Sequence, residues 1–142
     1  MQKHRQKRGS SVVSFSGGKD SCLALYKAIQ KGYRIKYLFN TISDDFERVR
    51  FHGVRKETVA MQAQALGIRL VQQETSGIDY ENEYVAALHN VRGNVDALVF
   101  GDIHVRNCYA FAKRVSKKVG LSLSEPLWGL RTENLFREFI NA

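Results

Sequence analysis

The stretch SVVSFSGGKDS, residues 11–21, passes from a buried strand to a helix through two glycines. Its first half is rich in β-branched and aromatic residues, which predicts a short strand over 11–16 that ends at Gly17 and Gly18. Beyond Asp20, apolar residues recur at helical spacing as far as Gly32, a residue typical of a helix C-terminus. These apolar positions are Cys22, Leu23, Leu25, Tyr26 and Ile29. The stretch therefore predicts a strand, a glycine turn and a helix, in that order.

The alternation of strand and helix patterns continues along the whole chain. Strands are predicted at 35–39, 68–72, 97–100 and, with a shorter pattern, 121–123, and helices at 54–66, 80–91, 105–119 and 133–140. The fold class is therefore predicted to be α/β, a Rossmann-like three-layer sandwich with a parallel sheet of about five strands. Such sheets bind ligands at the carboxyl ends of their strands, which here are the segments 16–21, 40–45, 74–77 and 101–106.

Length and composition indicate one folded domain. The chain has 142 residues, of which 44% are hydrophobic and 25% charged, values typical of a globular protein. It contains neither the roughly 18 consecutive apolar residues of a membrane-spanning helix nor the apolar core of a signal peptide, so a cytoplasmic protein without a membrane partner is expected. The two cysteines, Cys22 and Cys108, have no metal-like spacing, and both are expected to be reduced core thiols.

The positive charge indicates an anionic partner. The formal net charge is +8 and the isoelectric point is near 9.7, which favours a nucleotide, RNA or an acidic protein. Part of this charge lies in residues 1–9, through Lys3, Arg5, Lys7 and Arg8. This segment is predicted to be a basic flexible tail, with RNA docking as the alternative, and residues 10–142 are predicted to be the ligand-binding domain.

The glycine turn is a predicted phosphate site. Between a strand and the start of a helix, free backbone N–H groups and the helix dipole favour an anion. Gly17 and Gly18 let the backbone approach phosphate oxygens, hydroxyl donors come from Ser16 and Ser21, and Lys19 supplies a positive charge. The turn is not a Walker A loop, because Val13 replaces its first glycine and Asp20 follows the lysine. It also lacks the third glycine of the dinucleotide fingerprint.

In this context, SGGKDS resembles the PP-loop of the N-type ATP pyrophosphatases, which share the HUP/PP-loop type of fold. The resemblance implies that the β and γ phosphates of ATP are held on the loop. An acceptor oxygen then attacks the α phosphorus, pyrophosphate leaves, and the acceptor is adenylated.

Further motifs narrow the resemblance to the diphthine-ammonia ligase-like family. They are His52-Gly53, Ala65-Leu66-Gly67-Ile68, Val99-Phe100-Gly101-Asp102-Ile103, Gly120-Leu121 and Pro126-Leu127-Trp128-Gly129. Members of this family are similar in activating a carboxylate, on a modified histidine of translation elongation factor 2, as an acyl adenylate that ammonia attacks. The implied reaction is an ATP-dependent amidation, with a protein or small-molecule carboxylate as the acceptor.

The resemblance also implies roles for individual residues. The phosphates, bridged by Mg²⁺, would lie on the loop formed by Ser16, Gly17, Gly18, Lys19, Asp20 and Ser21. Ser14, Phe15 and Asn40 would lie near the adenosine, and Gly101 and Asp102 would face the acceptor. Lys19 and Asp102 are the predicted catalytic residues, and His52 is predicted to contact the acceptor. No metal-ligand set is assigned, because Asp20 is either a Mg²⁺ ligand or a charge favoured by the helix dipole.

Two departures from the family pattern leave the function open. The segment 104–111 differs from the usual one after Gly-Asp-Ile, and the chain stops at Ala142, where family members continue into a C-terminal domain. The alternatives are a PP-loop enzyme that thiolates transfer RNA and a nucleotide-binding module without turnover. A homo-oligomer is expected. Trp128 is predicted to be buried at the sheet edge or to wall the cleft, and residues 44–50 are predicted to be a mobile loop beside the site.

Overall fold

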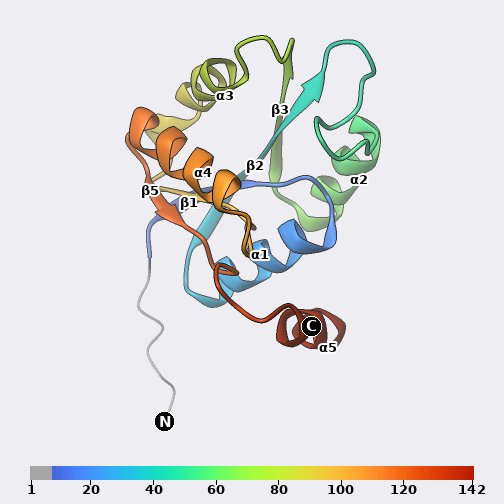
Figure 1. Cartoon of the computed structure of the whole chain (residues 1–142), viewed down its shortest axis with the longest axis vertical. Coiled ribbons are helices and arrows are strands. Elements are labelled where there is room, and N and C mark those ends of the chain that lie inside the picture. Colours follow the sequence, from blue (N-terminus) through green and yellow to red (C-terminus); the bar gives the residue numbers. More distant parts are fainter. Residues whose placement is uncertain (1–7) are drawn as a thin grey trace.

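A parallel β-sheet runs through the centre of the molecule, with helices on both of its faces (Figure 1). The computed structural model describes residues 8–142 and contains, in that range, a five-stranded sheet in the order β3-β2-β1-β4-β5. The predicted basic tail lies almost wholly outside the described residues. Its last two residues are hydrogen-bonded, since Arg8 donates to the Gly32 carbonyl at 3.2 Å and the Gly9 carbonyl accepts from Arg34 at 3.3 Å.

The elements follow the order predicted from the sequence. The strands are β1 Ser10–Ser14, β2 Arg34–Ser43, β3 Arg69–Thr75, β4 Ala97–Val99 and β5 Ser122–Ser124. The helices are α1 Lys19–Gln30, α2 Lys56–Leu66, α3 Tyr80–His89, α4 Arg106–Val119 and α5 Thr132–Asn141, with a short 3-10 helix η1 Arg92–Asn94. None of the helices within residues 8–142 has the length and apolar character needed to cross a membrane. The predicted Rossmann-like fold is confirmed.

Successive residues of the central strands pack into two separate cores, one on each face of the sheet. Side chains alternate between the faces of a strand, so Val12 packs with α3 and α4 while Val13 packs with α1, α2 and α5. All the strand pairs are parallel, and β1 is bonded to β2 on one side and β4 on the other. The chain therefore first adds strands on one side of β1, as β2 and β3, and then on the other side, as β4 and β5. In sheets of this kind, ligands bind beyond the strand ends at the point where the strand order reverses.

Strand β2 is longer than its apolar pattern predicts. The predicted strand stops at Phe39, whereas β2 continues through Asn40 and Thr41 to Ser43 and pairs with β3 up to Thr75. Tertiary hydrogen bonds hold these polar side chains in the strand: Asn40 Nδ2 donates to the Phe15 carbonyl at 3.2 Å, and the Thr41 and Tyr80 hydroxyls bond at 2.8 Å. Asn40 therefore lies within the strand and not in the loop that follows it.

The segment predicted as a loop beside the site folds back along β2. The Ser43 N–H donates to the Arg48 carbonyl at 2.9 Å, and the Arg50 N–H donates to the Thr41 carbonyl at 2.9 Å. Val49 is buried in the core below this turn. The return places Arg50 at the carboxyl end of the sheet.

Candidate functional site

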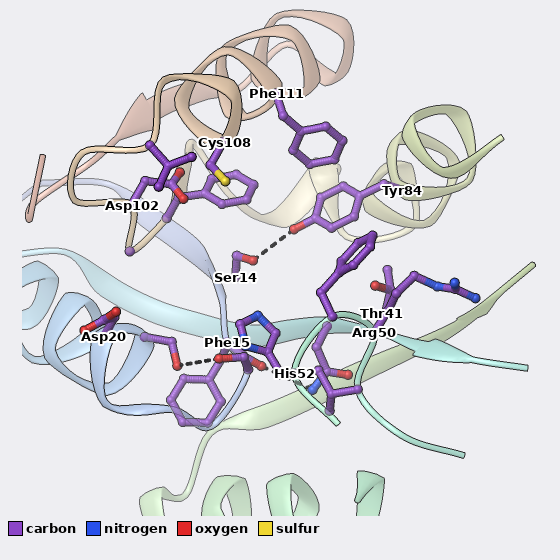
Figure 2. Close-up of a pocket in the computed structure, with 18 of the residues that line it drawn as sticks. Ser14, Phe15, Asp20, Thr41, Arg50, His52, Tyr84, Asp102, Cys108 and Phe111 are labelled. Carbon is purple, nitrogen blue, oxygen red and sulfur yellow. Dashed lines mark hydrogen bonds between the residues drawn. The ribbon is translucent and has the colours of Figure 1, made fainter. Parts of the chain in front are cut away.

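A pocket of about 640 Å³ opens at the carboxyl ends of β1, β2 and β4 (Figure 2). Its walls come from the loop after β1, the turn after β2, the loop after β4, and the facing sides of α3 and α4. Most of the residues predicted for the site line it. They are Ser14, Phe15, Ser16, Asp20, Ser21, Asn40, His52, Gly101 and Asp102. The fold thus brings together residues from four separate parts of the sequence.

The glycine loop forms a ring of hydrogen bonds at the start of α1. The Gly18 N–H donates to Ser16 Oγ at 3.3 Å, Ser21 Oγ donates to the Gly18 carbonyl at 3.0 Å, and the two serine hydroxyls lie 3.3 Å apart. No side chain among residues 8–142 caps α1. Its first-turn N–H groups are therefore free to bind an anion at the positive end of the helix dipole.

Only the first of the two glycines is required by the backbone. Gly17 has a φ of +83°, and a Cβ there would lie 2.4 Å from Gln62 Oε1. Gln62 also holds the loop, because its Nε2 donates to the Gly17 carbonyl at 3.1 Å. Gly18 has a φ of −78°, and a Cβ would lie 3.4 Å from Ser16 Oγ. A Cβ at Gly18 would therefore make only an ordinary van der Waals contact with the protein.

Lys19 lies at the rim of the loop and does not line the pocket. Its side chain is exposed, and its Nζ forms an ion pair with Asp20 Oδ1 at 3.1 Å. Gly17 and Gly18 likewise lie outside the lining. The predicted catalytic lysine is thus adjacent to the pocket, with its ammonium engaged by the carboxylate of the next residue.

The loop after β4 packs directly on the start of α1. A Cβ at Gly101 would lie 3.0 Å from the Asp20 carbonyl oxygen, so any larger residue would press the loop away from the backbone of α1. The next residue, Asp102, donates its N–H to Glu125 Oε2 at 3.2 Å. Burial, with a further contribution from Asp102, raises the pKa of Glu125 to about 9. Glu125 was not predicted for the site. The only sequence signal was its place directly before the Pro126-Leu127-Trp128 motif.

Aromatic rings line the side of the pocket formed by α3 and α4. They are Phe51, Tyr80, Tyr84, Phe100 and Phe111. Tyr84 donates to Ser14 Oγ at 3.1 Å, which joins the aromatic wall to the end of β1 (Figure 2). Burial raises the pKa of both Tyr80 and Tyr84, so both phenols stay protonated at neutral pH. The sequence did not distinguish these rings from ordinary core residues.

The turn after β2 contributes a cation and an exposed ring. Arg50 Nε donates to Thr75 Oγ1 at 2.8 Å, and its guanidinium lies 6.0 Å from the centre of the Tyr80 ring. Phe51 has a φ of +68° and is 80% exposed, and its ring forms a T-shaped pair with Tyr80. A bulky residue in the left-handed region is strained. His52 follows it and is exposed.

The two cysteines differ in their surroundings. Cys22 packs against the α1 core, as predicted, and burial raises the pKa of its thiol. Cys108 was predicted to be a core thiol, which is wrong, because it is exposed and lines the pocket. It lies on the same stripe of α4 as the buried Ala112, one turn closer to the helix N-terminus, where the helix faces the pocket. Burial and the nearby carboxylates of Asp102 and Glu125 raise the pKa of the Cys108 thiol.

Trp128 lies away from the pocket. It is half-buried and stacks on Tyr109 of α4, with ring centres 4.4 Å apart. It therefore does not wall the cleft, and it is only partly buried against α4. Among residues 8–142 there is no group of three or more His, Cys, Asp or Glu side chains arranged to hold a metal ion.

Comparison with solved structures shows where the same fold occurs. A predicted subunit of a tRNA methyltransferase from Methanocaldococcus jannaschii has a TM-score of 0.59 and 17% identity, over 92% of this chain and 75% of that one. The protein PH1313 from Pyrococcus horikoshii Ot3 has the same score and identity, over 94% and 41%. The U34-tRNA thiolase NcsA from Methanococcus maripaludis, solved with its 4Fe-4S cluster, has a TM-score of 0.59 and 12% identity, over 99% and 60%. The chain thus spans less than two thirds of the last two structures.

The family comparison is more specific than the structural one. Curated protein sequences give no match to the chain. The family model of the diphthamide synthase N-terminal domain matches residues 9–123, which include β1, the glycine loop and the loop after β4. This match covers most of the chain and confirms the resemblance indicated by the SGGKDS loop. The chain therefore belongs to the diphthamide synthase N-terminal domain family, within the PP-loop ATP pyrophosphatase superfamily.

Proposed function

We propose that this domain binds ATP and cleaves it to AMP and pyrophosphate while adenylating an acceptor carboxylate, which ammonia then converts to an amide. One observation carries the proposal: a single pocket joins the anion-binding loop at the start of α1 to the Asp102 carboxyl at the end of β4. An ATP molecule bound in this pocket, with its β and γ phosphates on the loop, would have its α phosphorus between the loop and Asp102.

The loop is suited to the β and γ phosphates. The free N–H groups of the first turn of α1 and the hydroxyls of Ser16 and Ser21 supply donors. Lys19 is exposed, so its ammonium can leave Asp20 and turn toward a bound phosphate. Mg²⁺ usually binds through one or two carboxylates together with substrate phosphates, and Asp20 is the carboxylate in that position. The ion would neutralise charge on the departing pyrophosphate.

The adenosine fits at the ends of β1 and β2. Asn40 is buried in the pocket wall, and its Oδ1 has no hydrogen-bond partner among residues 8–142. A buried amide oxygen without a donor is costly, and an amino group such as that of adenine would satisfy it. Ser14 and Phe15, next to Asn40, would complete the contact. Because the Asn40 amide also donates to the Phe15 carbonyl, its oxygen is held in a fixed direction.

The acceptor would approach from the side of Gly101, Asp102 and His52. Its carboxylate oxygen forms a bond to the α phosphorus, and the bond to the β-phosphate oxygen breaks as pyrophosphate leaves. Ammonia then attacks the acyl carbon, loses a proton and displaces AMP. Asp102, the pocket carboxylate on the acceptor side, would accept this proton. The domain spans only part of two of its structural neighbours, so a further domain is expected to complete the acceptor site.

A transfer-RNA-modifying enzyme is the second candidate, and the charge on α4 favours it. This helix carries Arg106, Lys113, Arg114, Lys117 and Lys118 and no acidic residue, and it begins at the pocket rim. Two of the structural neighbours are named for transfer RNA. Against thiolation, the pKa of both thiols is raised, whereas a sulfur carrier needs an accessible thiolate. Transfer RNA binding that persists at moderate salt would support this candidate.

Calorimetry with ATP and Mg²⁺, combined with a pyrophosphate assay, tests the proposal. We compare the wild type with Lys19→Ala combined with Gly18→Val, which removes the charge and fills the loop. Lys31→Ala, an exposed lysine beyond the C-terminus of α1, is the matched control. The loop variant should bind ATP at least about tenfold more weakly while the control binds normally. ATP binding without pyrophosphate release, with carboxylates and ammonium present, would support a nucleotide sensor instead. A wild type that does not bind ATP would refute the proposal.

A further inference from the structure

The acidic pair formed by Asp102 and Glu125 is the feature that the proposed reaction leaves unexplained. Asp102 lines the pocket after β4, whereas Glu125 follows β5 and stands behind it. The Asp102 N–H donates to Glu125 Oε2 at 3.2 Å. A backbone donor that points at a carboxylate from another strand fixes the orientation of both residues. This bond therefore connects the pocket wall to the outer edge of the sheet.

The segment after β5 holds the segment after β4 at two further points. The Phe100 N–H donates to the Ser124 carbonyl at 3.0 Å, and the Gly129 N–H donates to the Ile103 carbonyl at 2.8 Å. Leu127, between the two anchors, is fully buried. Glu125 thus supplies the side-chain bond of a three-point clamp on the turn that carries Asp102.

Each of the two carboxyls also has a buried oxygen that accepts no hydrogen bond from the described residues. These oxygens are Asp102 Oδ2 and Glu125 Oε1. Two buried carboxylates side by side repel each other, and a single proton held between them removes one charge and supplies the missing hydrogen bond. Burial first, and then the side chain and the negative charge of Asp102, raise the pKa of Glu125 to about 9, whereas the hydrogen bond from the Asp102 N–H lowers it.

Few other titratable groups influence this pair. On α4 the group is the Cys108 thiol, whose pKa the two carboxylates help to raise. On α3 it is the buried Tyr84 phenol, whose pKa Asp102 helps to raise. On α1, the group that contacts the loop carrying Asp102 is the Asp20 carbonyl, which lies against Gly101 and does not titrate. The pair has no cation in ion-pair contact within the described part of the chain.

We propose that Glu125 is a positioning residue, which clamps the Asp102 turn and shares one proton with the Asp102 carboxyl, so that the pocket presents one negative charge where two carboxyls stand. This inference rests on the proposed function, in which an ATP phosphate and an acceptor carboxylate must both approach Asp102. With both carboxyls ionised, the pair would repel both ligands. With one proton shared, Asp102 keeps an oxygen for the reaction and Glu125 keeps the turn in place.

The first test measures the proton directly. Carbon-13 NMR of side-chain carboxyls is followed from pH 4 to pH 11, and Glu125→Gln assigns the signal of Glu125. In the wild type, Glu125 should titrate near pH 9, and in Asp102→Asn its midpoint should fall by at least about one pH unit. A Glu125 midpoint near the ordinary 4.5, or one that Asp102→Asn does not move, would overturn the shared proton. This readout does not depend on ATP binding.

The second test measures the consequence for the pocket. Affinity for ATP with Mg²⁺ is compared at pH 7.5 and pH 10 in a Cys108→Ser background, so that the thiol does not titrate. Between pH 7.5 and pH 10, the affinity of the protein with Glu125 should fall roughly threefold more than the affinity of Glu125→Gln. The glutamine keeps the clamp and carries a permanent N–H donor. Glu125→Ala should bind ATP weakly at both pH values, and Glu133→Gln, an exposed glutamate of α5, should behave like its parent.

The two failures are distinguishable. Equal pH dependence in the parent and Glu125→Gln, or normal binding by Glu125→Ala, would overturn the positioning role while leaving ATP binding intact. Loss of ATP binding by the parent protein itself would overturn the proposed function, and the NMR midpoint would still decide whether the proton is shared.

Discussion

The Tyr84 hydroxyl donates a hydrogen bond to Ser14 Oγ at 3.1 Å, across the pocket from α3 to the last residue of β1. Tyr84 is buried and stands at the centre of the aromatic wall, where it contacts Phe39, Phe100 and Phe111. Ser14 comes just before the glycine loop. The bond therefore ties the apolar side of the pocket to the strand that presents the anion-binding loop.

Removal of this hydroxyl should destabilise the domain modestly. In Tyr84→Phe, the ring packing remains while Ser14 Oγ loses its donor, so the free energy of unfolding should fall by about 0.5–1.5 kcal/mol. Urea denaturation measures this change. Tyr26→Phe, on the exposed side of α1, is the control and should leave stability within about 0.5 kcal/mol. Equal stability of Tyr84→Phe and the wild type would show that the bond contributes nothing.

The glycine loop should distinguish its two glycines. Gly17→Ala places a Cβ in the left-handed region at a φ of +83° and against Gln62, so the free energy of unfolding should fall by roughly 1–2 kcal/mol. Gly18→Ala adopts an ordinary backbone conformation and should change stability by less than about 0.5 kcal/mol. If Gly18→Ala is the more destabilising of the two, the loop conformation described here is wrong.

Local sequence patterns predicted the elements and the loop because these depend on residues close together in the chain. Residues 11–21 contain the patterns of a strand, a turn and a helix. The glycines mark the turn, and α1 begins directly after Gly18, at Lys19. The end of β2 could not be predicted this way. Asn40 and Thr41 are polar, and only their bonds to Phe15 and Tyr80, made in the folded chain, explain why they lie in a buried strand.

The parts of the site that were missed depend on contacts between distant elements. Tyr84 and Phe111 have the helical spacing of core residues, and nothing in the sequence shows that both rings line a pocket. The position of Cys108 was mispredicted for the same reason. Glu125 meets Asp102 only because β4 pairs with β5. The register of this pairing cannot be predicted from the local sequence of either strand.

Glu125 should make stability depend on pH. Its pKa in the folded protein is about 9, above the ordinary value of 4.5, so the folded state binds this proton more tightly than the unfolded state. The stabilisation is complete below pH 4.5 and is lost as the pH rises through 9. The free energy of unfolding of the wild type should therefore fall relative to Glu125→Gln between pH 5 and pH 9. Urea denaturation across this range measures the difference. A constant difference would show that Glu125 titrates normally.

Cys108 should report occupancy of the pocket. The thiol is exposed and lines the pocket, and its pKa is raised by burial and by Asp102 and Glu125. Alkylation by iodoacetamide should therefore be slow at neutral pH and accelerate at alkaline pH, since the thiolate is the reactive form. ATP with Mg²⁺ should slow the reaction by at least about fivefold, because at 90% occupancy about a tenth of the sites stay open. In Cys108→Ser, the remaining label on Cys22 should be insensitive to ATP, because that thiol packs against the core of α1. Equal rates at Cys108 with and without ATP, at concentrations where calorimetry shows saturation, would place the nucleotide away from α4 and restrict it to the loop and the ends of β1 and β2.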